Sequence, residues 1–191
     1  MPQDTALHRA AKDGDIEGCL EAIQAGVGIN APGAQGRTAL HRALGGGFAE
    51  CAQKLIDNGA DPLIPDAMKR TSLHWAVMGM GELDKIMACI ELLFECQVVS
   101  QMVNAQSKSL STPLHCAITA GKEEVAAVLL SRGGADPNLC DEDDKTCKML
   151  AKEAGMKSLF EDSSVHGGKK RGGFFSSGRR RGSSKKDEVN L

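Results

Sequence analysis

Thr38-Ala-Leu-His-Arg-Ala43 is one of four copies of the pattern Thr-x-Leu-His-x-Ala in this chain. The other copies begin at Thr5, Thr71 and Thr112, and a degraded fifth copy runs from Thr146 to Ala151. Successive threonines lie 33, 33, 41 and 34 residues apart. A period this regular indicates a stack of similar units, each covering the apolar face of its neighbour.

Each copy carries the signals of a helix pair. Threonine suits a helix N-cap, and Pro113 falls at the first helical position, where a missing N–H does no harm. About eight residues later a second apolar run begins in each unit, at 16–23, 49–56, 86–94 and 125–130. Glycine follows most of these runs, as at a helix C′ position. Each unit is therefore predicted to be a helix, a short turn, an antiparallel helix and an extended loop.

These residues resemble the ankyrin repeat over roughly residues 3–162. The family pattern is matched by Gly36-Arg-Thr-Ala-Leu-His-Arg-Ala43, by Leu55-Ile-Asp-Asn-Gly-Ala-Asp61 and by Val103-Asn-Ala105. The resemblance implies an all-α solenoid of stacked antiparallel helix pairs with β-hairpin-like loops. Its repeats are expected near 3–35, 36–68, 69–109, 110–143 and 144–162, the last a truncated cap.

The chain departs from the family pattern in two places. Only the first loop keeps the turn glycine, Gly36, and the matching positions hold Lys69, Leu110 and Asp144. The third unit is eight residues longer than its neighbours. We expect the extra residues between Trp75 and Val99, with 78–87 as the favoured segment, as a longer turn between the helices or an extended second helix.

Composition predicts a reduced, cytoplasmic or nuclear monomer. The chain has no tyrosine and 3% aromatic residues, so aliphatic residues, cysteine and methionine must fill its core. The seven cysteines lack paired C-x-x-C spacing. Five of them, in the predicted helices, are expected to act as small buried apolar side chains: Cys19, Cys51, Cys89, Cys96 and Cys116.

Charge separates a body from a tail. Residues 1–162 hold 15 basic and 23 acidic side chains, whereas residues 163–191 hold 8 basic and 2 acidic ones. This Gly/Ser-rich tail is predicted to be disordered. Its basic residues fit a nuclear localisation signal, an anionic membrane contact, a nucleic-acid contact or a solvated segment: Lys169, Lys170, Arg171, Arg179, Arg180, Arg181, Lys185 and Lys186. Ser183 follows Arg180-Arg-Gly and is a candidate phosphorylation site.

No enzyme motif, metal site or cofactor site is expected, and no small-molecule substrate. The recurrent histidines His8, His41, His74 and His115 occupy one position per unit, too far apart to share a metal. The family resemblance implies that they hydrogen-bond within the loop and helix framework. Trp75 is either a partner anchor or a partly buried core residue, and the latter is favoured.

The resemblance implies a non-catalytic scaffold, adaptor or inhibitor that binds another protein on a concave face. In the family this face consists of loop tips and of exposed positions on the first helix of each pair. Carried onto this chain, the contact candidates are Lys12, Asp13, Met68, Arg70, Met78, Gly79, Thr119, Asp141, Glu142, Asp143, Asp144 and Glu153. The alternative is that the basic tail binds an anionic membrane or nucleic acid, regulated by serine phosphorylation.

Overall fold

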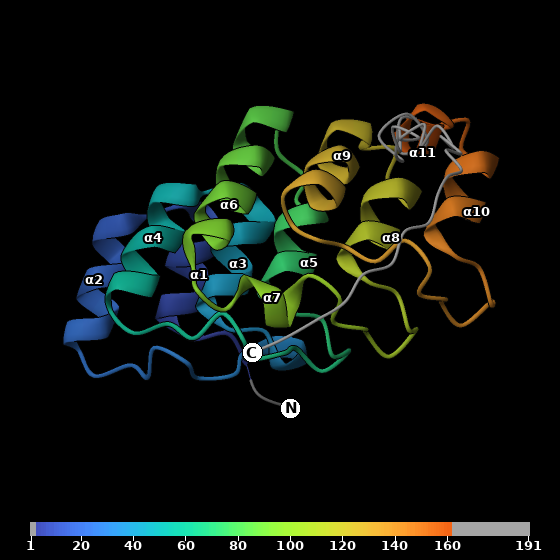
Figure 1. Ribbon diagram of the computed structural model, residues 1–191. Coiled ribbons are helices and arrows are strands. Elements are labelled where there is room, and N and C mark those ends of the chain that lie inside the picture. The colour runs from blue at the N-terminus through green and yellow to red at the C-terminus, as the bar shows by residue number, and fades with distance from the viewer. Residues whose placement is uncertain (1–2, 162–191) are drawn as a thin grey trace, which may run out of the picture. The chain divides into compact units, whose positions relative to one another are not determined.

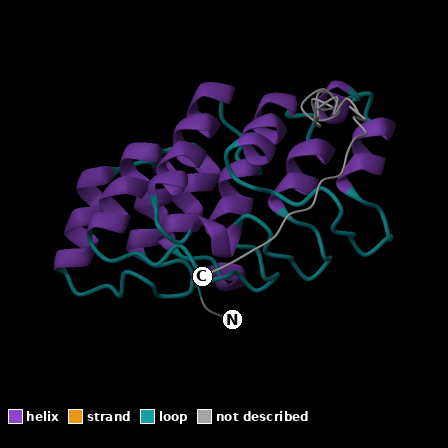
Figure 2. Ribbon diagram, in the orientation of Figure 1, coloured by secondary structure: helices purple, strands orange, loops and turns teal. Residues whose placement is uncertain are grey.

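The computed structural model describes residues 3–161. Within that range the chain forms eleven α-helices and one short 3₁₀ helix, and its only bridge-type pairing joins Cys140 to Thr146 (Figure 2). The prediction of an all-α fold is confirmed. The predicted tail, with its basic clusters and Ser183, lies outside the described residues.

The helices form two rows, one for each member of the predicted pairs (Figure 1). The first row contains α1 (Ala6–Asp13), α3 (Ala39–Gly46), α5 (Ser72–Val77), α8 (Pro113–Thr119) and α10 (Cys147–Glu153). The second contains α2 (Ile16–Gln24), α4 (Ala49–Asp57), α6 (Leu83–Glu95), α9 (Glu123–Ser131) and the four-residue α11 (Ser158–Glu161). The 3₁₀ helix η1 (Ala34–Gly36) and α7 (Val99–Met102) lie in loops. Each first-row helix packs against the next, so the units stack in chain order.

The repeated threonines begin the first-row helices as predicted. The Oγ1 atoms of Thr38, Thr112 and Thr146 accept the N–H three residues later at 3.3–3.4 Å. Four first-row helices are followed by a glycine in the left-handed conformation nine residues after the threonine: Gly14, Gly47, Gly121 and Gly155, with φ of 70–80°. The hexapeptide therefore encodes the start of each helix, and the glycine encodes the end.

The repeated leucines form the centre of the core. Leu7, Leu40, Leu73 and Leu114 occupy the same position in successive units, and each has 0% of its surface exposed. Burying one such side chain contributes about 2 kcal/mol through the hydrophobic effect. Cys19, Cys51 and Cys89 of the second row are buried as predicted, whereas Cys96 and Cys116 are only half-buried.

The loops are rigid hairpin-like turns joined to one another by main-chain bonds. One N–H···O bond closes each, for example Asp66 N to Arg70 O at 2.9 Å. Bonds between successive loops run from Ala67 N to Gln35 O and from Lys108 N to Met68 O. The same position is left-handed in all four loops: Gly36, Lys69, Leu110 and Asp144 have φ of 71°, 59°, 55° and 57°. Three side chains therefore occupy a conformation that favours glycine, at about 1–2 kcal/mol each.

The extra residues of the third unit lie mostly beyond the predicted segment 78–87. α6 begins twelve residues after Thr71, compared with eleven in the other three complete units. It then runs for 13 residues, compared with nine for α2, α4 and α9, and α7 follows it. An extended second helix is thus confirmed, and it lies between Trp75 and Val99 as expected, but the favoured segment 78–87 is wrong for most of the insertion. The apolar side chains Leu92, Leu93 and Met102 explain this, because they are buried and hold the added residues in the core.

The third unit also lacks the glycine that ends the other first-row helices. Met80 occupies that position and is 96% exposed, and α5 ends early, at Val77. A side chain from the next unit compensates. The ammonium group of Lys122 donates to the carbonyl oxygens of Val77 and Gly79, both at 2.7 Å. Burial lowers the pKa of Lys122.

We expect the substitution Lys122→Met to destabilise the protein by about 2 kcal/mol, because it removes two hydrogen bonds from a charged donor and leaves two carbonyl groups unsatisfied. Urea denaturation followed by circular dichroism measures this change. Lys152→Met is the matched control, since Lys152 is exposed in the last turn of α10. Equal midpoints for the two variants would contradict the assigned role.

Candidate functional site

The predicted contact surface consists of the loops 33–37, 66–70, 107–111 and 141–145 and the last turns of the first-row helices. We call it the loop face. Eight candidate side chains on it are exposed: Lys12, Asp13, Met68, Thr119, Glu142, Asp143, Asp144 and Glu153. Arg70, Met78 and Asp141 are half-buried. Gly79 is buried, with the carbonyl oxygens of Leu44 and Gly45 about 3.4 and 3.5 Å from the position of a Cβ atom, so its prediction as an exposed residue is wrong.

At the acidic end of the loop face, fewer carboxylates are available to a partner than the sequence suggests. One carboxylate oxygen of Asp141 accepts the N–H groups of Asp143 and Lys145, both at 3.0 Å, which commits this side chain to the loop. Lys145 forms an ion pair of 2.7 Å with Glu153. Hydrogen bonding and attraction to Glu153 raise the pKa of Lys145. The carboxylates exposed to a partner are therefore mainly those of Glu142, Asp143 and Asp144, which we call the acidic loop.

A second charged group is formed by loop and first-row helix residues of the first three units. We call Arg37, Arg42, Arg70 and Trp75, with the carboxylates Asp4 and Asp66, the arginine–tryptophan cluster. The guanidinium carbons of Arg37 and Arg70 lie 4.4 and 4.6 Å from the centroid of the Trp75 ring. These two cations are therefore at most 9.0 Å apart. Stacking on an aromatic face offsets part of the repulsion between them.

Asp66 is the buried carboxylate that connects Arg70 and Trp75 in this cluster. Its side chain is fully buried, and its Oδ2 accepts from Arg70 Nε at 2.8 Å and from Trp75 Nε1 at 3.1 Å. Its Oδ1 accepts the N–H groups of Met68 and Arg70 at 2.7 and 2.9 Å. Burial acts to raise the pKa of this carboxyl, but the hydrogen bonds from Arg70 and Met68 and the charge of Arg70 outweigh it and lower the pKa.

The positive charges of the cluster exceed its negative charges by one. Asp66 pairs with Arg70, and Asp4 pairs with Arg42 at 2.5 Å. None of the described carboxylates lies within ion-pair distance of Arg37, whose guanidinium donates only to Gln35. The buried Nε atoms of Arg37 and Arg42 have no hydrogen-bond partner among the described residues. Burial and the charges of Arg42 and Arg70 lower the pKa of Arg37.

The repeat register placed Arg70 on the loop face, but it did not place Arg37 or Arg70 beside Trp75. It also missed Asp66 and Asp4. The repeat pattern held only a partial signal for Asp66, because the equivalent position is again an aspartate in the fourth loop, Asp141, but is Gly33 and Ser107 in the other two. The preference for Trp75 as a partly buried core residue is confirmed, since the side chain packs against the core.

The histidines form the predicted framework bonds, with one exception. In each complete unit Nδ1 accepts the N–H of the threonine three residues earlier, at 3.0–3.2 Å, so the proton is on Nε2. The Nε2 atoms of His8, His74 and His115 donate to loop carbonyl oxygens of the following unit at 2.9–3.3 Å. The Nε2 of His41 is buried without a partner among residues 3–161, and its ring lies 6.2 Å from that of Trp75.

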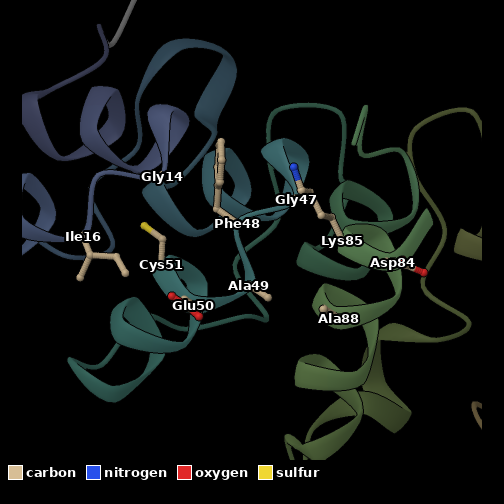
Figure 3. A pocket seen from close by; sticks show the side chains of 10 residues that line it. All are labelled: Gly14, Ile16, Gly47, Phe48, Ala49, Glu50, Cys51, Asp84, Lys85 and Ala88. Carbon is tan, nitrogen blue, oxygen red and sulfur yellow. The ribbon is translucent and has the colours of Figure 1, made fainter. Parts of the chain in front are cut away.

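An open cavity of about 400 Å³ lies among the second-row helices and the turns that precede them (Figure 3). Gly14 and Ile16, the segment 47–51, and Asp84, Lys85 and Ala88 line it. Burial raises the pKa of the Cys51 thiol to about 12, so this sulfur stays protonated near neutral pH and is a poor nucleophile. The Cys51 thiol lies 3.6 Å from that of Cys19, and both are free.

Within residues 3–161, no three histidine, cysteine, aspartate or glutamate side chains converge as a metal site would require. No helix in the same range combines the length and the apolar character of a membrane span.

The stacked helix pairs, joined by rigid loops, define a repeat solenoid. The family model for three copies of the ankyrin repeat matches residues 7–96, and the single-repeat model matches residues 110–142. Together these matches cover more than half of the 191-residue chain, which therefore belongs to the ankyrin-repeat family. The unmatched stretch between them contains α7. A search of curated proteins finds no significant match. Ankyrin repeats are in general modules that bind other proteins.

Proposed function

We propose that this protein is a non-catalytic adaptor, scaffold or inhibitor that binds a protein partner on its loop face. The main support is the presence of exposed apolar side chains on rigid loops. Met68 and Leu110 are 45% and 46% exposed, and main-chain bonds fix the loops that carry them. Leu110 does so in a left-handed conformation, a strained arrangement of the kind that concentrates at functional sites.

The charges on the loop face indicate what such a partner presents. The acidic loop, Glu142 to Asp144, is exposed on the loop next to that of Leu110, to which it is joined by the bond from Glu142 N to Ser109 O. A matching partner carries an apolar segment flanked by basic side chains. Exposed ion pairs contribute about 0.2–1 kcal/mol each, so they select the partner more than they determine the affinity.

Reversing Glu142, Asp143 and Asp144 to lysine is expected to reduce partner capture by the full-length protein about tenfold, because three weak attractions become repulsions. Quantitative pull-down from extract at fixed ionic strength measures this effect. Asp141 is left unchanged because it supports the loop. The matched control reverses three exposed acidic residues near the carboxyl ends of second-row helices, where lysine is compatible with the helix dipole: Glu21, Asp57 and Glu95.

Undiminished capture after reversal of the acidic loop would contradict its proposed role. Binding that falls steeply with salt and is lost when residues 163–191 are removed would instead favour the basic tail as the working part. That alternative rests on the 8 basic and 2 acidic side chains of the tail. It includes regulation at Ser183, where phosphate would reduce the positive charge. Salt-tolerant capture by the protein without the tail would support the loop face.

A further inference from the structure

We propose that the arginine–tryptophan cluster binds a single carboxylate, that of an aspartate or glutamate side chain on the protein partner. This inference rests on the proposed function and adds an acidic anchor to it. The cluster lies on the same loop face as the acidic loop but in the first three units, so the two ends of the face select for opposite charges.

The geometry of Arg37 is the first argument. Its guanidinium carbon lies over the Trp75 ring, 4.4 Å from the centroid, and such a contact with an aromatic face does not consume the N–H donors of the group. Those donors fit a carboxylate in a bidentate arrangement. Among the described residues, Gln35 alone accepts from this group, and the buried Nε has no partner there.

The charge of the cluster is the second argument. Three guanidinium groups face two carboxylates, and each carboxylate already pairs with one arginine. His41 adds no charge at neutral pH, because burial lowers its pKa to about 4. One monoanionic ligand therefore balances the cluster and relieves the repulsion between Arg37, Arg42 and Arg70. A phosphate group, with a charge of about −1.5 to −2, would overshoot this balance.

The surroundings of the cluster favour a peptide side chain over a free anion. Met68 lies between Asp66 and Arg70 in the same loop and is 45% exposed, so an apolar neighbour of the bound acid has a surface to contact. Gly45 is half-exposed, and a Cβ atom there would lie 3.1 Å from the Trp75 ring. The absence of that Cβ atom leaves this edge of the ring uncovered.

The two charged ends are two to three loops apart. With packed units spaced at about 10 Å, a partner that uses both carries an acidic residue roughly 20–30 Å from its basic residues. This spacing distinguishes the proposed partner from a uniformly basic one, which would bind the acidic loop alone.

Tryptophan fluorescence reports on the site directly, because Trp75 is the only tryptophan in the sequence. We would titrate the full-length protein with acetyl-Leu-Glu-Leu-amide at constant ionic strength and follow tryptophan emission. We expect a saturable change with a dissociation constant of about 1 mM, the range of a single small contact. The peptide acetyl-Leu-Gln-Leu-amide, which has the same shape and no charge, should bind at least about tenfold more weakly.

Substitutions of arginine test whether the peptide binds at the arginine–tryptophan cluster. Arg37→Gln is expected to weaken binding of the glutamate peptide by about tenfold or more, and Arg37→Lys by less, because lysine keeps the charge but loses the planar fork. Arg132→Gln is the matched control. Arg132 also lies over an aromatic ring, Phe94, and pairs with a carboxylate, but it belongs to the fourth unit. Its substitution should leave the titration unchanged.

Three results would overturn the proposal. They are equal binding of the glutamate and glutamine peptides, unchanged binding by Arg37→Gln, or tighter binding of inorganic phosphate than of the glutamate peptide at the same ionic strength. The peptide comparison alters nothing in the protein, so it decides the question even if a variant folds poorly. Failure here would leave the proposed function standing, since that depends on partner capture through the acidic loop.

Discussion

Asp66→Ala is expected to destabilise the protein by about 4 kcal/mol, which is the range for breaking a buried ion pair on one side. The side chain of Asp66 is fully buried and accepts four hydrogen bonds, from Arg70 Nε, Trp75 Nε1 and two main-chain N–H groups. Its removal leaves the positive charge of Arg70 unpaired within 9.0 Å of Arg37. Guanidinium-induced unfolding followed by circular dichroism measures the loss.

Asp141 provides a matched control for this prediction. It occupies the same position in the fourth loop and accepts the equivalent two main-chain N–H groups, at 3.0 Å, but it pairs with no arginine of residues 3–161. Asp141→Ala is therefore expected to destabilise by only about 1 kcal/mol, as for the loss of a capping side chain. Losses of similar size would show that the ion pair contributes little.

A double-mutant cycle separates the contribution of the Asp66–Arg70 ion pair to stability from that of the other contacts of Asp66. Because Arg70→Ala removes the stranded cation, the double variant Asp66→Ala/Arg70→Ala should be more stable than the sum of the single losses predicts, with a coupling of about 1–3 kcal/mol. Strict additivity of the two losses would contradict the assignment of Asp66 as the counter-charge of the cluster.

Acidification from pH 6.5 to pH 4 is expected to remove about 3 kcal/mol of stability through His41 alone, at about 1.4 kcal/mol for each unit of pKa shift. Burial lowers the pKa of His41 from 6.5 to about 4. Between these values the unfolded chain binds a proton and the folded chain does not, so stability rises with pH through this window and is lost as pH falls. Burial also lowers the pKa of His74, which adds to the loss.

The structure gives the physical reason for this pH dependence. Protonation of His41 would convert Nδ1 from an acceptor of the Thr38 N–H into a donor, and would place a charge near Arg37 and Arg70. Urea denaturation at pH 7, 5.5 and 4.5 measures the dependence. The His41→Gln variant, although less stable at neutral pH, should show a flatter profile over this range. Parallel profiles for the two proteins would contradict the prediction.

The fold could be predicted from the sequence in large part because each unit repeats the same local signals. The threonine that starts a helix, the buried leucine and the framework histidine lie within six residues of one another in each copy. The positions of the loop turns followed from the same register, including the left-handed residues Lys69, Leu110 and Asp144. The site of most of the third-unit insertion did not follow, because burial of Leu92, Leu93 and Met102 in the core holds the added residues in an extended α6 and in α7.

From the sequence, the candidate site could be predicted only as a surface, the loop face, and not as a set of interacting side chains. The register placed Met68 and Arg70 on the loop tips and identified the acidic loop, and eight of the twelve predicted contact residues are exposed. It also included two residues that are not available to a partner. Asp141 accepts main-chain N–H groups of its own loop, and Gly79 is buried. The arginine–tryptophan cluster was beyond reach because its members come from three units and meet only when those units stack.

The sequence by itself determined the helix pairs, their order and the composition of the core, since these depend on contacts within a unit or with an identical neighbouring position. Tertiary structure alone decided which charges meet. Asp4 pairs with Arg42 across 38 residues, and Lys122 reaches Val77 across 45. Stacking brings such residues together at a distance set by the whole fold, and electrostatic interactions depend on that distance and on burial. The repeated sequence pattern therefore determines the scaffold, whereas the arrangement of charges that would select a partner depends on how the repeats stack.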